Sequence, residues 1–283
     1  MTKGFEKFLD VVGQYNIPST GYATNGLLFN EEIISASISN GIKEITISID
    51  GATKPTYEFI REGGNFDKLL SKLSLFKEMV IKAKSRNPYL KFNFVVSRSN
   101  HHEMPALIDL AKEYNVKVIR VRIFRDWGGT FTFERESLVG HERSFNDSLE
   151  EAKRRASKFG IQLLAPKGFS YGAGEKPVLK YDENKYIPST PCIYPWFYRY
   201  IDPRGKIRVC QHLPLSSENI NGKYTMKDFE NSEEERRRKD LLKTSPSAGC
   251  FKHVCDGAPL NWVDDDVNFI KTQRHLFSGP AVG

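Results

Sequence analysis

All four cysteines of this 283-residue chain lie in its last third, in two pairs. Cys192 and Cys210 form the first pair, and Cys250 and Cys255 form the second. Four thiolates in two groups are a common ligand set for one tetrahedral metal ion or one cubane iron–sulfur cluster. We therefore predict that these cysteines hold a metal centre. Their number alone does not distinguish zinc from an iron–sulfur cluster.

The segment between Cys192 and Cys210 predicts how the first pair is brought together. Two short strand-like runs, 197–201 and 206–209, flank the sequence Asp202-Pro-Arg-Gly205. Proline and glycine stand there at positions typical of a tight turn, so a hairpin is expected. Because a hairpin brings its two ends together, both cysteines can face one ion, and the second cysteine pair can complete the shell from a loop.

Two other states of the cysteines are open at this point. Buried free thiols are one, since cysteine is among the most buried residue types. Chance placement, however, would not leave the first 191 residues without any cysteine. Disulfides are disfavoured, because the N-terminal sequence has no apolar signal-peptide segment and a reducing, cytoplasmic location is therefore expected.

The overall composition is that of an ordinary globular protein, with 39% hydrophobic and 27% charged residues. No apolar run approaches the roughly 20 residues of a membrane-spanning helix, so we expect no membrane association. The net charge of +7 is scattered along the chain, which does not favour nucleic acid and is compatible with an anionic or peptide partner. The densest charged run, 233–240, is mixed in sign and predicts a solvated helix face.

Helix-like and strand-like segments alternate through the first part of the chain, as in βαβ units on a parallel sheet. The predicted helices are 5–15, 30–40, 56–61, 66–84, 103–114 and 142–159, and the predicted strands are 22–25, 42–49, 90–97, 116–124 and 161–165. Residues 166–191 predict a linker, and two short helices are predicted at 225–230 and 232–243. Since the first element is a helix, the chain is expected to begin part-way through its fold.

Several segments resemble the radical S-adenosylmethionine (SAM) enzymes. Ala23-Thr-Asn-Gly-Leu27, Glu44-Ile-Thr-Ile-Ser-Ile-Asp-Gly-Ala-Thr53 and Phe92-Asn-Phe-Val-Val-Ser-Arg-Ser-Asn100 are similar to the middle strands of that fold. Cys192, Gly205 and Cys210, together with Pro-Cys-x-x-Pro-Trp, resemble the SPASM or twitch auxiliary-cluster domain.

The resemblance implies an α/β fold with three parts. Residues 1–165 would form a partial (β/α) barrel of radical SAM type that lacks its first βα unit or units. Residues 166–191 would be the linker, and 192–283 a small SPASM/twitch iron–sulfur domain with a C-terminal tail. The helical stretch that begins at Met226 also resembles the segment between the cysteine groups of such domains.

The chain departs from the family pattern at its start. It contains neither the Cys-x-x-x-Cys-x-x-Cys motif that holds the SAM-cleaving cluster nor the Gly-Gly-Glu strand. Both belong upstream of residue 1 in the family, so we expect a truncated, divided or degenerate barrel that does not cleave SAM alone, and a partner chain could supply the missing strands. The four cysteines suffice for one auxiliary [4Fe-4S] cluster, with zinc as the alternative.

The resemblance also implies positions for SAM. Ser48 and Asp50 would lie near the ribose, and Arg61 would approach the carboxylate. The remaining candidates are Asn25, Asn93 and Arg98. From the residues alone, Ser48 and Asp50 fit a helix cap and turn equally well, Asn25 fits a turn, and Arg61 fits a surface position. Likewise, the adjacent pair His101-His102 fits a capping or surface role better than a metal pair.

The parent activity implied by the resemblance is radical oxidation or other modification of a peptide or small metabolite, with the cofactor carrying the radical chemistry. Two alternatives stay open. One is a non-catalytic peptide-binding module stabilised by zinc or a cluster, and the other is an unrelated barrel enzyme with a structural zinc site. In all three cases the predicted metal ion or cluster depends on the four cysteines.

Overall fold

The computed structural model describes residues 4–15, 17, 19–124, 135–138, 140–169, 199–208, 216, 219–220 and 223–244. The chain divides into two compact units, Met1–Leu179 and Lys180–Gly283. The predicted three-part division into barrel, linker and cysteine domain stays a prediction. No helix within the described ranges is long and apolar enough to cross a membrane.

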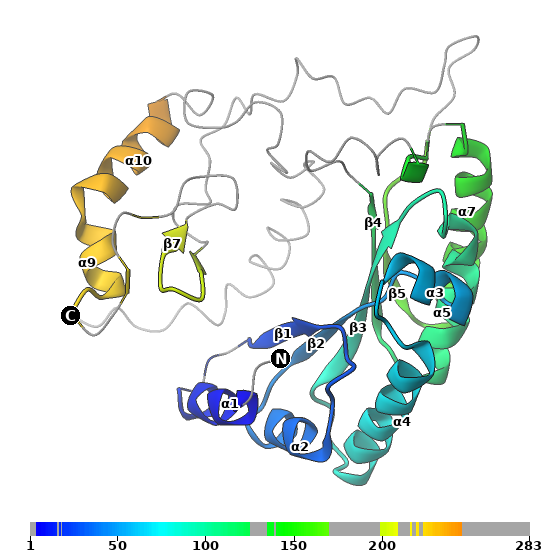
Figure 1. Ribbon diagram of the computed structural model, residues 1–283, viewed down its shortest axis with the longest axis horizontal. Coiled ribbons are helices and arrows are strands. Elements are labelled where there is room, and N and C mark those ends of the chain that lie inside the picture. Colours follow the sequence, from blue (N-terminus) through cyan, green and yellow to red (C-terminus); the bar gives the residue numbers. More distant parts are fainter. Residues whose placement is uncertain are drawn as a thin grey trace. The chain divides into compact units, whose positions relative to one another are not determined.

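The first unit is built on a five-stranded parallel sheet in which the strands follow one another in sequence order (Figure 1). The strands are β1 (Gly21–Thr24), β2 (Glu44–Ser48), β3 (Tyr89–Val96), β4 (Val118–Ile123) and β5 (Gln162–Leu164). The helical segments of this unit are α1 (Phe5–Gln14), α2 (Glu31–Ser39), α3 (Lys54–Ile60), α4 (Phe66–Lys82), η1 (His101–Glu103), α5 (Met104–Glu113) and α7 (Glu142–Phe159). The predicted α/β class with a parallel sheet is confirmed. The predicted strands 22–25 and 90–97 begin one residue late, and the other three predicted strands were two or three residues too long.

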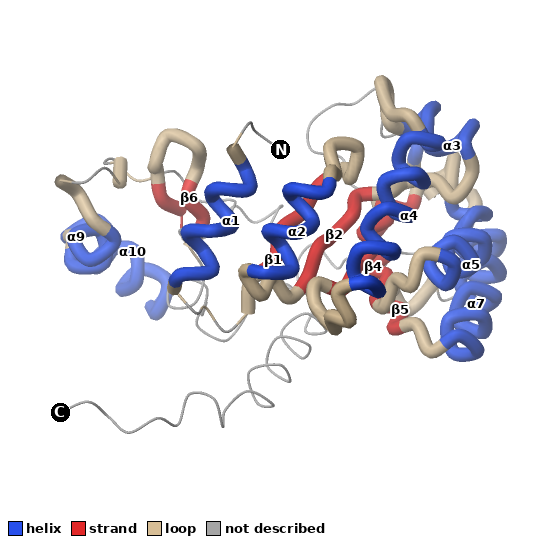
Figure 2. The backbone as a smooth tube through the Cα atoms, turned by 90° about the horizontal axis from the view of Figure 1, so that it is seen from below, coloured by secondary structure: helices blue, strands red, loops and turns tan. Residues whose placement is uncertain are grey.

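Helices cover one face of the sheet, as Figure 2 shows for α2, α4, α5 and α7. Alternation along each strand makes this two-sided arrangement possible. In β3, Leu90, Phe92, Phe94 and Val96 are at most 2% exposed and belong to the main hydrophobic core. The intervening residues of β3 are half-buried and point to the other face. That second face is consequently free to carry polar side chains.

Short polar side chains set where the helices begin. The Asn30 side chain accepts a hydrogen bond from the Ile33 amide at 2.9 Å, and Asn65 accepts one from the Lys68 amide at 2.7 Å. Both are N-caps, which satisfy amides that have no partner inside the helix. Helix α3 differs, because Thr53 stands at its N-cap position without a side-chain capping bond.

The second unit contains the predicted hairpin. Strands β6 (Tyr200–Ile201) and β7 (Ile207–Arg208) pair in antiparallel fashion. The turn between them is held by Asp202, whose Oδ1 accepts hydrogen bonds from the amides of Arg204 at 2.8 Å and Lys206 at 2.9 Å. Gly205 adopts a φ of +83°, which glycine tolerates best. The hairpin prediction is therefore confirmed for these residues.

Two helices follow the hairpin, α9 (Met226–Asn231) and α10 (Glu233–Thr244). Thr225 and Asp228 form a capping box at the start of α9. The charged run in α10 was predicted to be a solvated face, and Arg237 does pair with Glu233 at 2.6 Å. The prediction was wrong for Glu235, which is fully buried, 3.6 Å from Arg199. The side of α10 that carries Glu235 is therefore buried against Arg199.

Candidate functional site

The carboxyl end of β2 is joined to β3 and α3 through one carboxylate. Asp50 Oδ2 lies 2.6 Å from Arg61 Nη2, and Asp50 Oδ1 accepts the Val95 amide at 2.8 Å. The Asp50 side chain is 10% exposed and that of Arg61 is 27% exposed. Asp50 is therefore neither a helix cap nor a solvated turn residue, and Arg61 is not a free surface residue. The structure brings these two predicted site residues together.

Helix α3 and the residue that follows it each place one hydrogen-bond donor in the protein interior. Tyr57 Oη and Arg61 Nε are both buried, and neither has a hydrogen-bond partner among the described residues. Tyr57 and Arg61 are one helical turn apart, so their side chains share a face of α3. Burial raises the pKa of Tyr57, so its hydroxyl stays protonated as a donor at neutral pH. Buried donors without partners are rare and usually have an explanation.

Two other predicted site residues are neighbours across the sheet. Ser48 of β2 is the register partner of Asn93 of β3, and both are half-buried on the face away from the helices. The same row continues to Arg120 of β4, the partner of Asn93. We did not predict Arg120 as a site residue. The alternation Val118-Ile-Arg-Val-Arg-Ile123 could have identified it, because it assigns the two arginines to one face.

The last two predicted residues lie apart from this row. Asn25 is exposed after β1, and its side chain accepts the Leu27 amide at 3.2 Å, which forms the expected turn. Arg98 follows β3 with an exposed side chain. Since β2 separates β1 from β3, Asn25 and Arg98 are not adjacent strand-end residues. Their roles in SAM binding stay predictions.

The buried side-chain amide of Asn100 holds the backbone at the carboxyl ends of β2 and β3. Asn100 is fully buried and donates through Nδ2 to the carbonyls of Asp50 at 3.0 Å and Val95 at 2.9 Å. Its Oδ1 accepts the Ser97 amide at 2.7 Å. One side chain therefore uses both functions of its amide to fix the residues after β2 and the end of β3.

A buried carboxylate holds the loop that leads into α3. Glu103 is 6% exposed. It accepts hydrogen bonds from the Ala52 amide at 2.6 Å, the Thr53 hydroxyl at 2.5 Å and the Thr56 hydroxyl at 2.7 Å. The Thr53 amide adds a fourth at 3.2 Å. The Thr53 hydroxyl is thus directed to Glu103 rather than to the amides of its own helix. Sequence reasoning missed both Asn100 and Glu103.

Of the two adjacent histidines, His102 has the predicted surface position, whereas His101 does not. His101 is 5% exposed, whereas His102 is exposed. His101 Nδ1 lies 2.9 Å from the Arg98 carbonyl and Nε2 lies 2.8 Å from the Ser144 hydroxyl. A carbonyl only accepts, so Nδ1 carries the proton and Nε2 accepts from Ser144. Burial lowers the pKa of His101, and the nearby His102 and His141 contribute to the same direction.

This environment predicts a pH effect on stability. The unfolded chain binds a proton at His101 near the ordinary pKa of about 6.5, whereas the folded chain binds it at lower pH. Stability from His101 should be complete above about pH 6.5 and should fall as the pH drops toward the lowered pKa. Urea unfolding between about pH 7.5 and 5 measures how the free energy of unfolding depends on pH. This dependence should be weaker for His101→Gln than for the wild type. A His102→Gln control should keep the wild-type slope, and an unchanged slope in His101→Gln would contradict the expectation.

The predicted metal ligands Cys192, Cys210, Cys250 and Cys255 lie outside the described residues. Within the described ranges, no group of three or more histidine, cysteine, aspartate or glutamate side chains could hold a metal ion. The metal site therefore stays a prediction from the sequence.

Known proteins resemble this chain in sequence and in fold. No protein-family model matches the chain. Over 244 residues the chain is 25% identical to the AdoMet-dependent heme synthase of Methanosarcina barkeri. The matched region covers 83% of this chain and 67% of the synthase. This match supports the resemblance of the chain to the radical SAM family. This agrees with the family resemblance of the strand segments around Asp50 and Asn93.

Solved structures of another protein share the fold of this chain. Streptococcus suis SuiB bound to S-adenosylmethionine matches with a TM-score of 0.53 and 15% identity over 85% of this chain and 51% of SuiB. SuiB bound to its precursor peptide SuiA matches with a TM-score of 0.55 and 14% identity over 88% of this chain and 53% of SuiB. The chain thus spans about half the length of SuiB.

Proposed function

We propose that this chain binds SAM at the carboxyl edge of its sheet and one auxiliary [4Fe-4S] cluster through its four cysteines. It would act as part of a radical SAM enzyme that modifies a peptide or small metabolite. The observation that carries the proposal is the convergence of Asp50 and Arg61 at 2.6 Å, together with two buried donors, Tyr57 Oη and Arg61 Nε, that have no partner among the described residues. Ligands of α/β sheets bind at this edge, outside the carboxyl ends of the strands.

The residues of this edge fit SAM. A carboxylate at Arg61 would accept from the planar guanidinium, including the buried Nε that has no partner among the described residues. Tyr57 Oη could donate to the same anion. Ser48 and Asn93 offer hydroxyl and amide groups on the open face for the hydroxyls of a ribose. Asp50 already accepts from Val95 and Arg61, so its role in this proposal is to position Arg61.

The auxiliary cluster is proposed on the sequence of the second unit. The confirmed hairpin leads from β7 toward Cys210, and the predicted ligand Cys192 precedes β6. Zinc is the alternative occupant of four cysteines. A bound SAM supplies an adenosyl radical only when a reduced cluster delivers an electron to it. The 283 residues contain no Cys-x-x-x-Cys-x-x-Cys motif, so we propose that they do not cleave SAM by themselves.

A second chain or segment could supply the SAM-cleaving cluster. Strand β1 is the outer strand of the five-stranded sheet, and within the described residues only β2 pairs with it. Edge strands have unpaired backbone groups that accept another strand. We propose this edge as the place where further barrel strands would add.

Metal analysis tests the auxiliary cluster. After anaerobic reconstitution with iron and sulfide, the wild-type chain should hold about four iron atoms. The Cys192→Ala/Cys210→Ala double variant should lose nearly all of that iron, and so should Cys250→Ala/Cys255→Ala, because each removes two of four ligands. About one tightly bound zinc and no iron would favour a structural site on a peptide-binding module. No metal in the wild type would overturn the assignment.

Equilibrium dialysis with labelled SAM tests the edge itself. Arg61→Lys should weaken SAM binding by about tenfold or more, because lysine keeps the charge and loses the planar fork that binds a carboxylate bidentately. Lys68→Ala, an exposed cation on α4, should leave the affinity unchanged. Equal affinities for Arg61→Lys and the wild type would remove Arg61 from the site. No SAM binding by the wild type would favour the non-catalytic module.

A further inference from the structure

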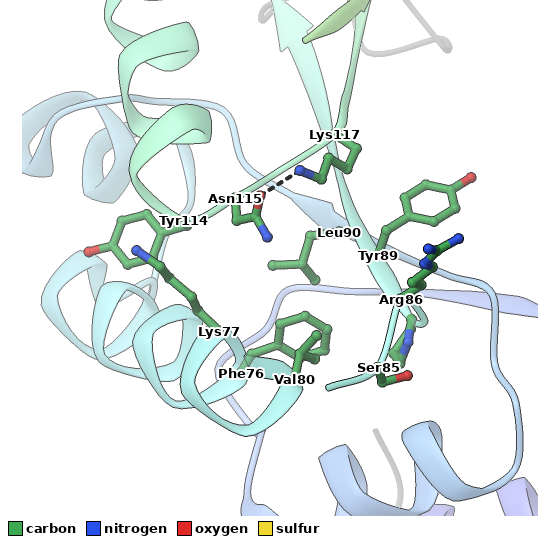
Figure 3. Close-up of a pocket in the computed structure, with 11 residues that line it drawn as sticks. Phe76, Lys77, Val80, Ser85, Arg86, Tyr89, Leu90, Tyr114, Asn115 and Lys117 are labelled. Atoms are coloured by element: carbon green, nitrogen blue, oxygen red, sulfur yellow. Dashed lines mark hydrogen bonds between the residues drawn. The ribbon is translucent and has the colours of Figure 1, made fainter. Parts of the chain in front are cut away.

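A cavity of about 220 Å³ lies at the opposite edge of the sheet, near the amino ends of β3 and β4 (Figure 3). It is bounded by the C-terminal half of α4, the segment that leads into β3 and the loop between α5 and β4. The site proposed for SAM lies beyond the carboxyl ends of the same strands. The two locations are therefore independent.

The floor of this cavity is apolar. Phe76 and Leu90 are 3% and 2% exposed, and Figure 3 shows the Leu90 side chain directed into the hollow above Phe76 and Val80. Tyr114 adds an aromatic wall. An apolar cavity of about 150 Å³ is enough to bind benzene. The present volume therefore accommodates one six-membered ring with a small substituent at the opening.

The rim of the cavity is cationic. Lys77, Arg86 and Lys117 all line it, and none of the lining residues is acidic. In Figure 3 these three side chains lie on different sides of the hollow. Lys77 Nζ donates to the Glu113 carbonyl at 2.8 Å, and Lys117 Nζ donates to Asn115 Oδ1 at 2.6 Å. A lysine ammonium has three donors, so each retains two for a ligand.

Asn115 adds a neutral donor at the same rim. Its backbone φ is +57°, a left-handed conformation that asparagine tolerates better than most residues. The bond from Lys117 occupies the amide oxygen. The amide nitrogen faces the hollow (Figure 3). Positive charge and an N–H donor thus surround the opening of an apolar cavity, which is an arrangement that suits an anion with an apolar body.

We propose that this cavity binds a small organic monocarboxylate with an aromatic or branched aliphatic body. The body would lie on Leu90 and Phe76, and the carboxylate would accept hydrogen bonds from Lys117 and the Asn115 amide. SAM itself does not suit the cavity, because its sulfonium and ammonium groups would meet three cations. The assignment does not depend on the proposed radical SAM function.

Calorimetric titration of the full 283-residue chain with phenylacetate tests the assignment. Phenylacetate should bind, phenylacetamide should bind about tenfold or more weakly because it lacks the charge, and benzylamine should not bind. Inorganic phosphate should bind more weakly than phenylacetate, since it cannot use the apolar floor. Equal binding of phosphate and phenylacetate would contradict the proposal, because it would show that surface cations bind any anion without use of the apolar floor. No binding of phenylacetate up to about 10 mM would overturn the proposal.

Variants locate the binding site. Lys117→Glu should weaken phenylacetate binding by about tenfold or more, because it replaces an attractive charge with a repulsive one. Lys77→Glu should weaken binding to a smaller extent, because its charge lies on another side of the hollow. Lys68→Glu makes the same change in net charge at an exposed position of α4 outside the cavity, and should leave the affinity unchanged. All three positions are at the surface or half-buried, so folding should survive. Equal affinities in the three variants would place phenylacetate elsewhere on the chain.

Discussion

Replacing Glu103 with alanine should lower the free energy of unfolding by about 3–4 kcal/mol. The side chain accepts two amide and two hydroxyl hydrogen bonds from the loop before α3 and the first turn of that helix. Alanine would leave these donors without partners in a region where Glu103 itself is only 6% exposed. Hydrogen bonds to charged groups each contribute about 1.5–3 kcal/mol net of the water bonds that they replace, so a loss of several kcal/mol is expected.

Urea unfolding followed by far-ultraviolet circular dichroism measures this loss, because most described helices belong to the first unit. Glu103→Gln should lose less than alanine, since one oxygen still accepts hydrogen bonds. Glu78→Ala, an exposed glutamate on α4, is the matched control and should change stability by no more than about 0.5 kcal/mol. A Glu103→Ala value as small as the control value would show that solvent replaces the four bonds.

Asn100→Ala should cost about 2–3 kcal/mol, the second-largest effect. The amide is fully buried and makes three hydrogen bonds to backbone groups of Asp50, Val95 and Ser97. Alanine leaves two carbonyls and one amide unsatisfied inside the protein. Because Asp50 positions Arg61, the same variant should also weaken SAM binding, if the proposed function holds.

The same denaturation assay separates this effect from a general asparagine effect. Asn25→Ala removes an exposed asparagine whose side chain makes one bond to the Leu27 amide, and should cost at most about 0.5 kcal/mol. Asn100→Asp should be as damaging as alanine, because a carboxylate cannot donate to the carbonyls of Asp50 and Val95. A stable Asn100→Asp protein would mean that the residues after β2 do not need these donors.

The order of the helices and strands could be predicted from local signals. Asn30 and Asn65 precede apolar helical patterns as N-caps, and the alternation of strand-like and helix-like segments is typical of a parallel sheet. The contacts of Glu103 could not be predicted, because its partners are 47–51 residues away in the sequence. Likewise, the pairing of Asp50 with Arg61 depends on how α3 packs, which periodicity does not specify. The cysteine assignments still depend on the sequence alone.

The Thr53 hydroxyl bonds to Glu103 instead of capping α3, and this has a consequence for the order in which the elements fold. Helix α3 has only seven residues and no side-chain cap of its own, and helices this short do not persist in isolation. Its first turn is instead held by Glu103, which belongs to a segment that comes after β3 in the chain. Helix α3 should therefore form only after β3 and η1 have docked. The donors of Tyr57 and Arg61 would then be assembled late, so a nascent chain acquires its proposed cofactor edge only after synthesis has passed Glu103 and β3 has folded.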